Sequence, residues 1–222
     1  METYTNNFHS KNLYIKIKDI NQIRPEDFDK LIKESGKALQ IGLYSNQTEV
    51  IAFLKKCGFC LKRVTYELEV GKADLKNPFI ADGIKLKKTT KGQKAYDICL
   101  ELLYAYYKKT HQSINPLSVG LEEFARTIPE NALYYDENRK LIFAAFLEND
   151  EIAYLAGYDL KNPKALIAAT LIEAFKTNEK IYFEADNTDP LASMMKEFFK
   201  ENSEPVYETY VKSENLGKCI YK

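Results

Sequence analysis

Two carboxylates stand at positions where they could take part in proton transfer. Glu184 lies inside the segment 181–186, which otherwise has the apolar and aromatic character of a buried strand, and Glu148 directly follows the apolar segment 141–147. A carboxylate held beside a cleft can act as a general base and remove a proton from a reacting group. The alternative for Glu184 is a place on the solvent-facing side of its strand, without a chemical role.

A second polar group precedes the apolar helix expected at residues 165–176. Asn162 stands directly before a proline, as a capping residue stands before the first helical position. Lys161 and Lys164 flank it, and a helix N-terminus with basic neighbours can hold a phosphate group. Residues 159–168 contain no glycine to let a ligand approach the backbone closely. The alternative is a capped surface loop with solvated lysines.

The four cysteines make a weaker pattern. Cys57 and Cys60 have the C-x-x-C spacing of redox enzymes, but they follow an expected helix, so no helix dipole lowers their pKa. Cys99 and Cys219 supply no second pair for a zinc site. We therefore expect no metal site, and thiols that are buried or idle.

The elements around these residues occur twice. Each copy reads as a strand, a turn at an asparagine, a helix and a second strand, and it follows another strand-helix pair. The intervals from Asn46 to Tyr66 and from Asn187 to Tyr207 are both about twenty residues. In the first copy, Ser45 or Asn46 is expected to cap the helix. The repeat predicts two similar α/β layers in one chain; the alternative is two unrelated layers that share a common pattern.

Between the copies, residues 71–88 have the Pro, Gly and Lys content of loops and turns, so we place a boundary there. Hydrophobic periodicity then predicts two helices followed by an antiparallel meander. The helices are expected at 94–109 and 121–127, and the strands at 132–135, 141–147 and 152–158.

This order of elements resembles the GNAT superfamily of N-acetyltransferases. The turn at Asn46, the helix and Gly58-Phe59 are similar to the penultimate segment of that fold; the second copy has Phe198 in place of the glycine. The resemblance implies an α/β (α+β) fold with a mixed sheet flanked by helices. It further implies a GNAT-like C-terminal half-fold at 1–75, before a fuller GNAT-like domain at 84–222.

The resemblance also implies a function, the transfer of an acetyl group from acetyl-CoA to an unidentified amine. Glu184 or Glu148 would be the base. The residues that would hold the co-substrate are Lys161, Asn162 and Lys164 at the diphosphate, and Asn187 with the backbone of Tyr154, Leu155 and Ala156 along the pantetheine arm.

Two departures from the family pattern support an alternative function. The glycines of the family's phosphate loop are missing from 159–168, and Leu54 and Met194 stand where the family often has an acid tyrosine. Tyr207 or Tyr210 could replace that acid, or simply pack on their strand. The alternative is a catalytically inactive GNAT-fold binding or assembly module.

The composition argues against some classes of binding partner. Lys plus Arg and Asp plus Glu both number 32, so no net charge attracts nucleic acid or an anionic membrane. No stretch approaches the roughly 18 apolar residues of a membrane span, and the first residues lack the features of a secretory signal. We expect a cytoplasmic protein, and the family resemblance implies a small-molecule or peptide amine as its substrate.

Overall fold

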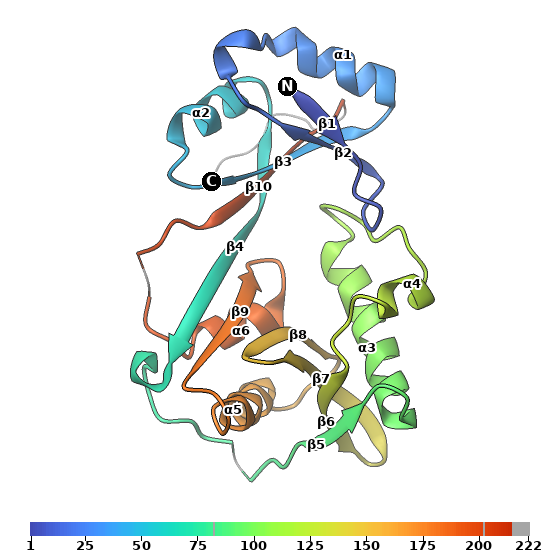
Figure 1. Ribbon diagram of the computed structural model, residues 1–222, viewed down its shortest axis with the longest axis vertical. Helices are drawn as coiled ribbons and strands as arrows, with labels where there is room; N and C mark the ends of the chain where they lie inside the picture. Colours follow the sequence, from blue (N-terminus) through green and yellow to red (C-terminus); the bar gives the residue numbers. More distant parts are fainter. Residues whose placement is uncertain (82, 202, 215–222) are drawn as a thin grey trace. The chain divides into compact units, whose positions relative to one another are not determined.

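The computed structural model describes residues 1–81, 83–201 and 203–214. The chain divides into two compact units, which are described separately (Figure 1). The first unit contains Met1–Thr65, His111–Val119 and the described part of Glu204–Lys222. The second contains Tyr66–Thr110 and Gly120–Ser203. Both units consist of a mixed sheet with helices, so the predicted α/β class is confirmed.

The first unit has its strands in the order β1-β2-β3-β10-β4. Strands β2 and β3 are parallel, and the other registered pairs are antiparallel. Its elements are β1 (Glu2–Tyr4), β2 (Asn12–Lys16), the 3-10 helix η1 (Ile20–Gln22), α1 (Pro25–Ser35), β3 (Ala38–Tyr44), α2 (Thr48–Lys56), the start of β4 (Cys60–Gly71) and β10 (Tyr207–Lys212).

Helix α1 forms where its sequence signals predict. Pro25 occupies the first turn, and Gly36 ends the helix in a left-handed conformation, with its N–H donating to the Ile32 carbonyl at 2.8 Å. Phe28 and Ile32 are buried in a core that both helices of this unit share with β2, β3 and β10. The amphipathic faces of α1 and α2 therefore cover the same apolar cluster.

The start of α2 differs from the prediction. The N-cap residue is Gln47, and no side chain makes a capping bond to the helix. Instead, the Gln47 side chain accepts from the Tyr44 backbone N–H at 2.9 Å, while the Ser45 hydroxyl accepts from the Val206 N–H at 3.1 Å. The predicted cap by Ser45 or Asn46 is wrong because the Ser45 hydroxyl bonds the chain before β10.

Strand β10 lies between β3 and β4, antiparallel to both. Tyr210 is fully buried in the core, which confirms the packing interpretation of that residue. The Tyr207 ring lies directly over Gly42, where a Cβ atom would overlap its hydroxyl group. Gly42 is therefore required by close packing.

The second unit has the strand order β4-β9-β8-β7-β6-β5, and the predicted meander is present as β6, β7 and β8. Strand β5 was not predicted. The elements are the end of β4, η2 (Lys72–Asp74), β5 (Lys87–Thr90), α3 (Lys94–His111), α4 (Leu121–Ala125), β6 (Asn131–Glu137), β7 (Lys140–Glu148), β8 (Glu151–Gly157), α5 (Pro163–Ala174), β9 (Lys180–Asp186) and α6 (Pro190–Lys196).

Aromatic contacts tie the helices of this unit to its sheet. Tyr96 of α3 packs edge-on against Phe146 of β7 at 5.6 Å between ring centres. Phe183 of β9 lies 5.6 Å from Phe199, which follows α6, and α5 is buried along most of its length. Strand β9 alternates between buried and more exposed residues, so one side of it contributes to the core.

The compact units and the predicted domains divide the chain differently. The sequence division separates 1–75 from 84–222, whereas β10 lies in the first unit and β4 contributes 60–65 to the first and 66–71 to the second. The repeated strand-helix-strand-helix order is present as β2-α1-β3-α2 and β8-α5-β9-α6. Among the described residues, no helix is both long and apolar enough to cross a membrane.

Candidate functional site

The candidate site begins where β8 and β9 meet. These strands are parallel, and their register contains one residue pair, Glu151 with Tyr182, at the start of both strands. Strand β8 is registered along its whole length with β7 on its other side. The later part of β8, with Tyr154, Leu155 and Ala156, therefore has no registered partner on β9. Backbone polar groups along such an edge are available to a ligand.

Three glutamates gather at the joined ends of these strands. Glu148 and Glu151 are opposite each other in the β7–β8 register, and Glu184 lies on the adjacent strand β9. Burial raises the pKa of Glu151, and the charges of Glu184, Glu148 and Asp150 raise it further. The structure therefore brings the two predicted bases together around a third carboxylate.

Glu151 is the residue that sequence reasoning missed. The sequence predicts the strand at 152–158, whereas β8 begins at Glu151, so this acid was not among the candidates. The i, i+3 pair of acids around a two-residue turn is the signal that could have found it, because such residues face each other across a hairpin. A raised pKa makes Glu151 a stronger base than an ordinary carboxylate.

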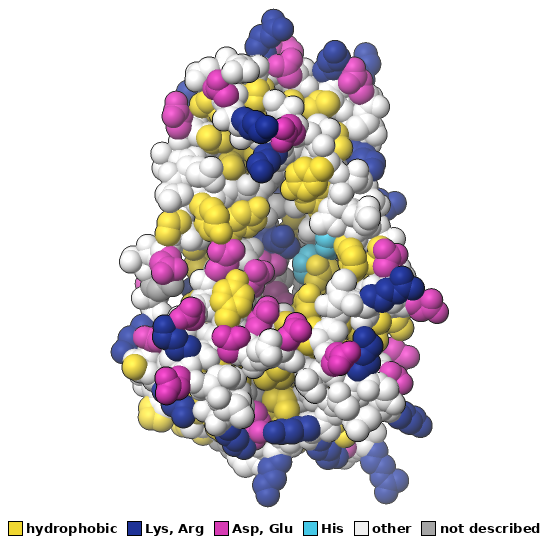
Figure 2. Space-filling model, in the orientation of Figure 1, with side chains coloured by type: hydrophobic (Ala, Val, Ile, Leu, Met, Phe, Trp, Pro, Cys, Tyr) yellow, Lys and Arg dark blue, Asp and Glu magenta, His cyan; other side chains and the backbone are white. Residues whose placement is uncertain are grey.

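Glu184 has a more exposed place than Glu151. It is exposed on β9, and its carboxylate accepts a hydrogen bond from the Tyr182 hydroxyl at 3.3 Å. Burial and then the Glu184 charge raise the pKa of Tyr182. Acidic side chains gather in Figure 2 over the region where Figure 1 draws β8 and β9.

An aromatic wall adjoins the carboxylates. Burial raises the pKa of Tyr154, with smaller contributions from Glu151 and Glu184. The Tyr154 ring lies 6.3 Å from Tyr107 of α3, which packs in turn on Phe124 of α4. Aromatic faces beside carboxylates suit the approach of a cationic amine.

At the far end of β9, Asp189 fixes the start of α6. Its side chain accepts from the N–H groups of Leu191 and Ala192, and from the Tyr106 hydroxyl at 2.7 Å. Burial raises the pKa of Asp189, and burial followed by the Asp189 charge raises the pKa of Tyr106. The Tyr106 hydroxyl therefore donates a hydrogen bond to a structural carboxylate and keeps its proton, which makes it a poor general acid. Asn187 is exposed in the turn before Asp189.

The start of α5 is capped as expected. The Asn162 side chain accepts from the Ala165 N–H at 3.3 Å, so it does occupy one amide that a phosphate would otherwise use. Lys161 makes an ion pair with Glu137 at 2.8 Å, and Lys164 makes one with Glu197 at 3.1 Å. Each of the two lysines is thus ion-paired with a different carboxylate.

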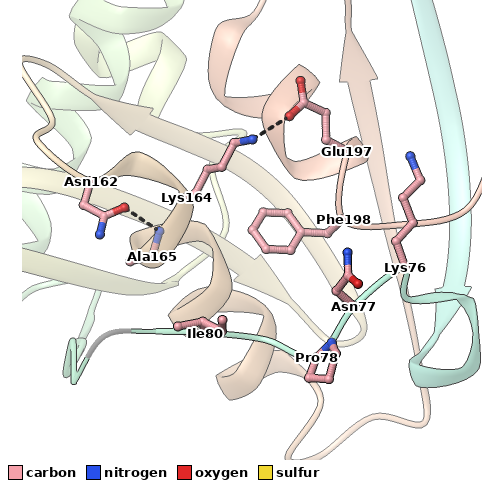
Figure 3. Close-up of a pocket in the computed structure, with 9 residues that line it drawn as sticks. All are labelled: Lys76, Asn77, Pro78, Ile80, Asn162, Lys164, Ala165, Glu197 and Phe198. Atoms are coloured by element: carbon pink, nitrogen blue, oxygen red, sulfur yellow. Dashed lines mark hydrogen bonds and ion pairs between the residues drawn. The ribbon is translucent and has the colours of Figure 1, made fainter.

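A pocket of about 520 Å³ opens at this helix start (Figure 3). Its lining joins α5 to the end of α6 and to the segment that follows η2, and consists of Lys76, Asn77, Pro78, Ile80, Asn162, Lys164, Ala165, Glu197 and Phe198. Two of the three predicted phosphate-side residues line it, Asn162 and Lys164, whereas Lys161 does not.

The predicted acid substitutes belong to the other unit. Tyr207 and Tyr210 lie on β10, and the Tyr210 hydroxyl donates to Glu208 at 2.6 Å. Met194, at the position of the family's tyrosine, lies half-buried in α6.

The thiols and possible metal ligands add nothing to this site. Cys57 and Cys99 are free and buried, and burial raises the pKa of Cys99 to about 12, so it is unreactive. Cys60 is disulfide-bonded, so the expectation of idle thiols does not hold for it. Cys219 lies outside the described residues. Within the described ranges, no group of His, Cys, Asp and Glu side chains could hold a metal ion.

Comparison with known proteins relates this fold to solved structures. No protein-family model matches the chain, and no curated protein matches it. A functionally unknown conserved protein from Staphylococcus epidermidis is 10% identical with a TM-score of 0.56, over 92% of this chain and 85% of that chain. A GCN5-related N-acetyltransferase (GNAT) from Sphaerobacter thermophilus is 10% identical with a TM-score of 0.54, over 98% and 78%.

A third similar structure is a probable N-acyltransferase from Enterococcus faecalis. It is 14% identical with a TM-score of 0.53, over 93% of this chain but only 56% of that longer chain. Identities this low relate the folds and not the activities. The mixed α/β fold of this chain matches that of GCN5-related N-acetyltransferases.

Proposed function

We propose that this protein is an N-acyltransferase that moves an acetyl group from acetyl-CoA to a small-molecule or peptide amine. The observation that carries the proposal is the arrangement of β8 and β9. The two strands are paired only at their start, beside three glutamates, and the rest of β8 has no registered partner on β9. The arrangement offers a base at one end and a backbone edge along which a thioester can lie.

In the reaction, Glu151 removes a proton from the ammonium form of the acceptor, directly or through one water, because only the neutral amine attacks a carbonyl carbon. The nitrogen forms its bond to the acetyl carbon, the carbon–sulfur bond breaks, and the second proton that the nitrogen loses passes to the leaving sulfur, so the amide and the free thiol are the products. Glu148 and Glu184 keep Glu151 basic and attract the cationic acceptor.

The residues that would hold acetyl-CoA are those of the β8 edge and the α5 start. The backbone of Tyr154, Leu155 and Ala156 would bond the pantetheine amides, with Asn187 at the end of β9. The pocket beside Asn162 and Lys164 would take the phosphate end, where Lys161 adds positive charge nearby. The acetyl group would then lie toward the glutamates.

The rival function is a catalytically inactive binding or assembly module of the same fold. One observation favours it: Asn162 caps α5, and Lys161 and Lys164 are already ion-paired, so the usual place for phosphates is partly occupied. Such a module would bind acetyl-CoA without transferring the acetyl group, or would not bind it at all.

Calorimetry with acetyl-CoA, followed by a thiol-release assay against a panel of polyamines, amino acids and lysine peptides, separates the two. An acetyltransferase binds acetyl-CoA and releases thiol only when an acceptor is present. Absence of heat at millimolar acetyl-CoA would exclude the enzyme. Binding with no thiol release across the panel would favour the binding module.

A further inference from the structure

The first unit contains a polar cluster that the candidate site does not use. Two segments form it: the loop at residues 5–11, between β1 and β2, and the stretch His111–Val119, which begins at the end of α3. We call these two segments the clasp. The Ser118 N–H donates to the Phe8 carbonyl at 2.7 Å, and the Ser118 hydroxyl accepts from the Ser10 N–H at 2.8 Å. The clasp therefore joins parts of the chain that are 108 residues apart.

The clasp lies on the face of the sheet that α1 and α2 do not cover. Ile15 of β2 belongs to the core beneath those helices, so Tyr14, which precedes it on the same strand, points to the other face. Asn12 shares that face. Its side-chain amide donates to Gln40 of β3 and to the Ile114 carbonyl of the clasp, both at 2.8 Å. A buried amide thus ties the clasp to the sheet.

His9 is the titratable group enclosed by the clasp. It is 6% exposed, and its ring stacks on the His111 ring at 5.7 Å between centres. Burial lowers the pKa of His9, hydrogen bonds with the backbone of Asn115 and Pro116 oppose that shift, and the Arg63 charge adds to it. The closed clasp therefore favours the neutral ring over the charged one.

Two cations lie next to His9. Arg63 of β4 acts on it directly, and the Lys37 ammonium group, just before β3, donates to the carbonyl of the following residue, Ser10, at 2.7 Å. A proton on His9 would add a further positive charge to this buried region, against the stacked ring of His111. Such a charge is costly where water cannot solvate it.

Closing the clasp also leaves polar atoms buried without a hydrogen bond to a described residue. Among them are the Tyr14 hydroxyl and Asn115 Oδ1, on residues that are 7% and 5% exposed. Each such atom carries a desolvation cost, which water removes when the clasp opens. The clasp is therefore held less firmly than its hydrogen bonds alone would hold it.

We propose that the clasp is a pH-sensitive switch, closed when His9 is neutral and released when His9 is protonated. The chain has only two histidines, and both lie in the clasp. Because the closed state disfavours the proton, its stability is complete above the pKa of an open histidine, about 6.5, and is lost as the pH falls below that value. Release also frees the C-terminal end of α3, from which His111–Val119 continues. This inference does not depend on acetyl transfer.

NMR titration of the whole protein measures the switch directly, because only two imidazole rings give signals and His111→Gln assigns them. We expect His9 to titrate below pH 6.5. Hydrogen exchange at the Ser10 and Ser118 amides reports opening, since the clasp makes both of their hydrogen bonds. After correction for the intrinsic exchange rate, protection of these amides should fall about three- to tenfold from pH 7.5 to pH 5.5.

Two matched variants identify the group responsible. His9→Gln keeps a polar side chain that takes up no proton in this range, so the pH dependence of protection should disappear. His111→Gln, on the stacked ring, should keep it. A His9 ring that titrates at pH 6.5 or above, protection in the parent that does not change with pH, or a pH dependence that survives His9→Gln would each overturn the inference. The first two measurements use the parent, so they decide the question even if His9→Gln weakens the fold.

Discussion

The substitution Glu151→Gln tests whether a stability cost is built into the site. Glu148 and Glu151 are directly opposite in an antiparallel register, and like charges so placed cost about 0.2–1 kcal/mol. The amide has the same shape without the charge. At neutral pH we therefore expect the variant to be more stable by that amount, or roughly 0.5–4 °C in melting temperature for a chain of this length.

The gain should depend on pH in a defined direction. Folding raises the pKa of Glu151 above its unfolded value of about 4.3, so the folded state holds the proton more tightly. Below the unfolded pKa both states are protonated, and the parent pays no electrostatic cost. The cost appears as the pH rises through the folded pKa. The gain in melting temperature should therefore be present at pH 7–8 and vanish near pH 3–4.

The same substitution should lower activity. Loss of a general base typically costs about 10²–10⁴ in rate, so kcat should fall by that factor while the affinity for acetyl-CoA is kept. Thermal unfolding across pH and a thiol-release assay measure the two effects. Glu101→Gln, on an exposed position of α3, is the control and should change neither. A Glu151→Gln variant that is less stable at pH 8, or fully active, would refute the reasoning.

Two further substitutions test packing and capping. Gly42→Ala should destabilise the protein by about 1–3 kcal/mol in chemical denaturation, because the new methyl group overlaps the Tyr207 hydroxyl. Gly120→Ala places its methyl group in open space at the N-cap of α4, so it should cost less. Tyr106→Phe should cost about 1.5–3 kcal/mol, because it removes a 2.7 Å bond to the carboxylate that caps α6. Tyr158→Phe, on the packed partner ring, should cost less, and equal losses would contradict the role of that bond.

Local signals predicted the elements well. Pro25 and Gly36 mark both ends of α1, and the three meander strands were each located to within about two residues. These features depend on residues that are close together in the sequence, so they can be predicted from short segments. The predicted cap of α2 is wrong for the opposite reason. The Ser45 hydroxyl accepts a hydrogen bond from the Val206 N–H, and Val206 is remote in the sequence.

The candidate site was harder to predict from the sequence than the helices and strands were. Glu148 and Glu184 were chosen as separate candidates, whereas their neighbour Glu151 has the raised pKa. That shift depends on burial and on charges from two other strands, which no single segment encodes. The sequence predicts loop and turn between the domains at residues 71–88, whereas residues 76–80 line a pocket, and their place there depends on how Phe79 packs against Phe198. Strand pairing across long separations, above all that of β10, likewise had no local signal.

The position of β10 bears on how the protein is made. In the first unit, β3 and β4 are not neighbours in the sheet, because a strand synthesised much later lies between them. At about 5–20 residues per second, roughly 7–27 s of translation separate the end of β4 from the start of β10. During that time both strands have unpaired edges, which favour association with other chains. The nascent first unit should therefore depend on chaperones until β10 leaves the ribosome.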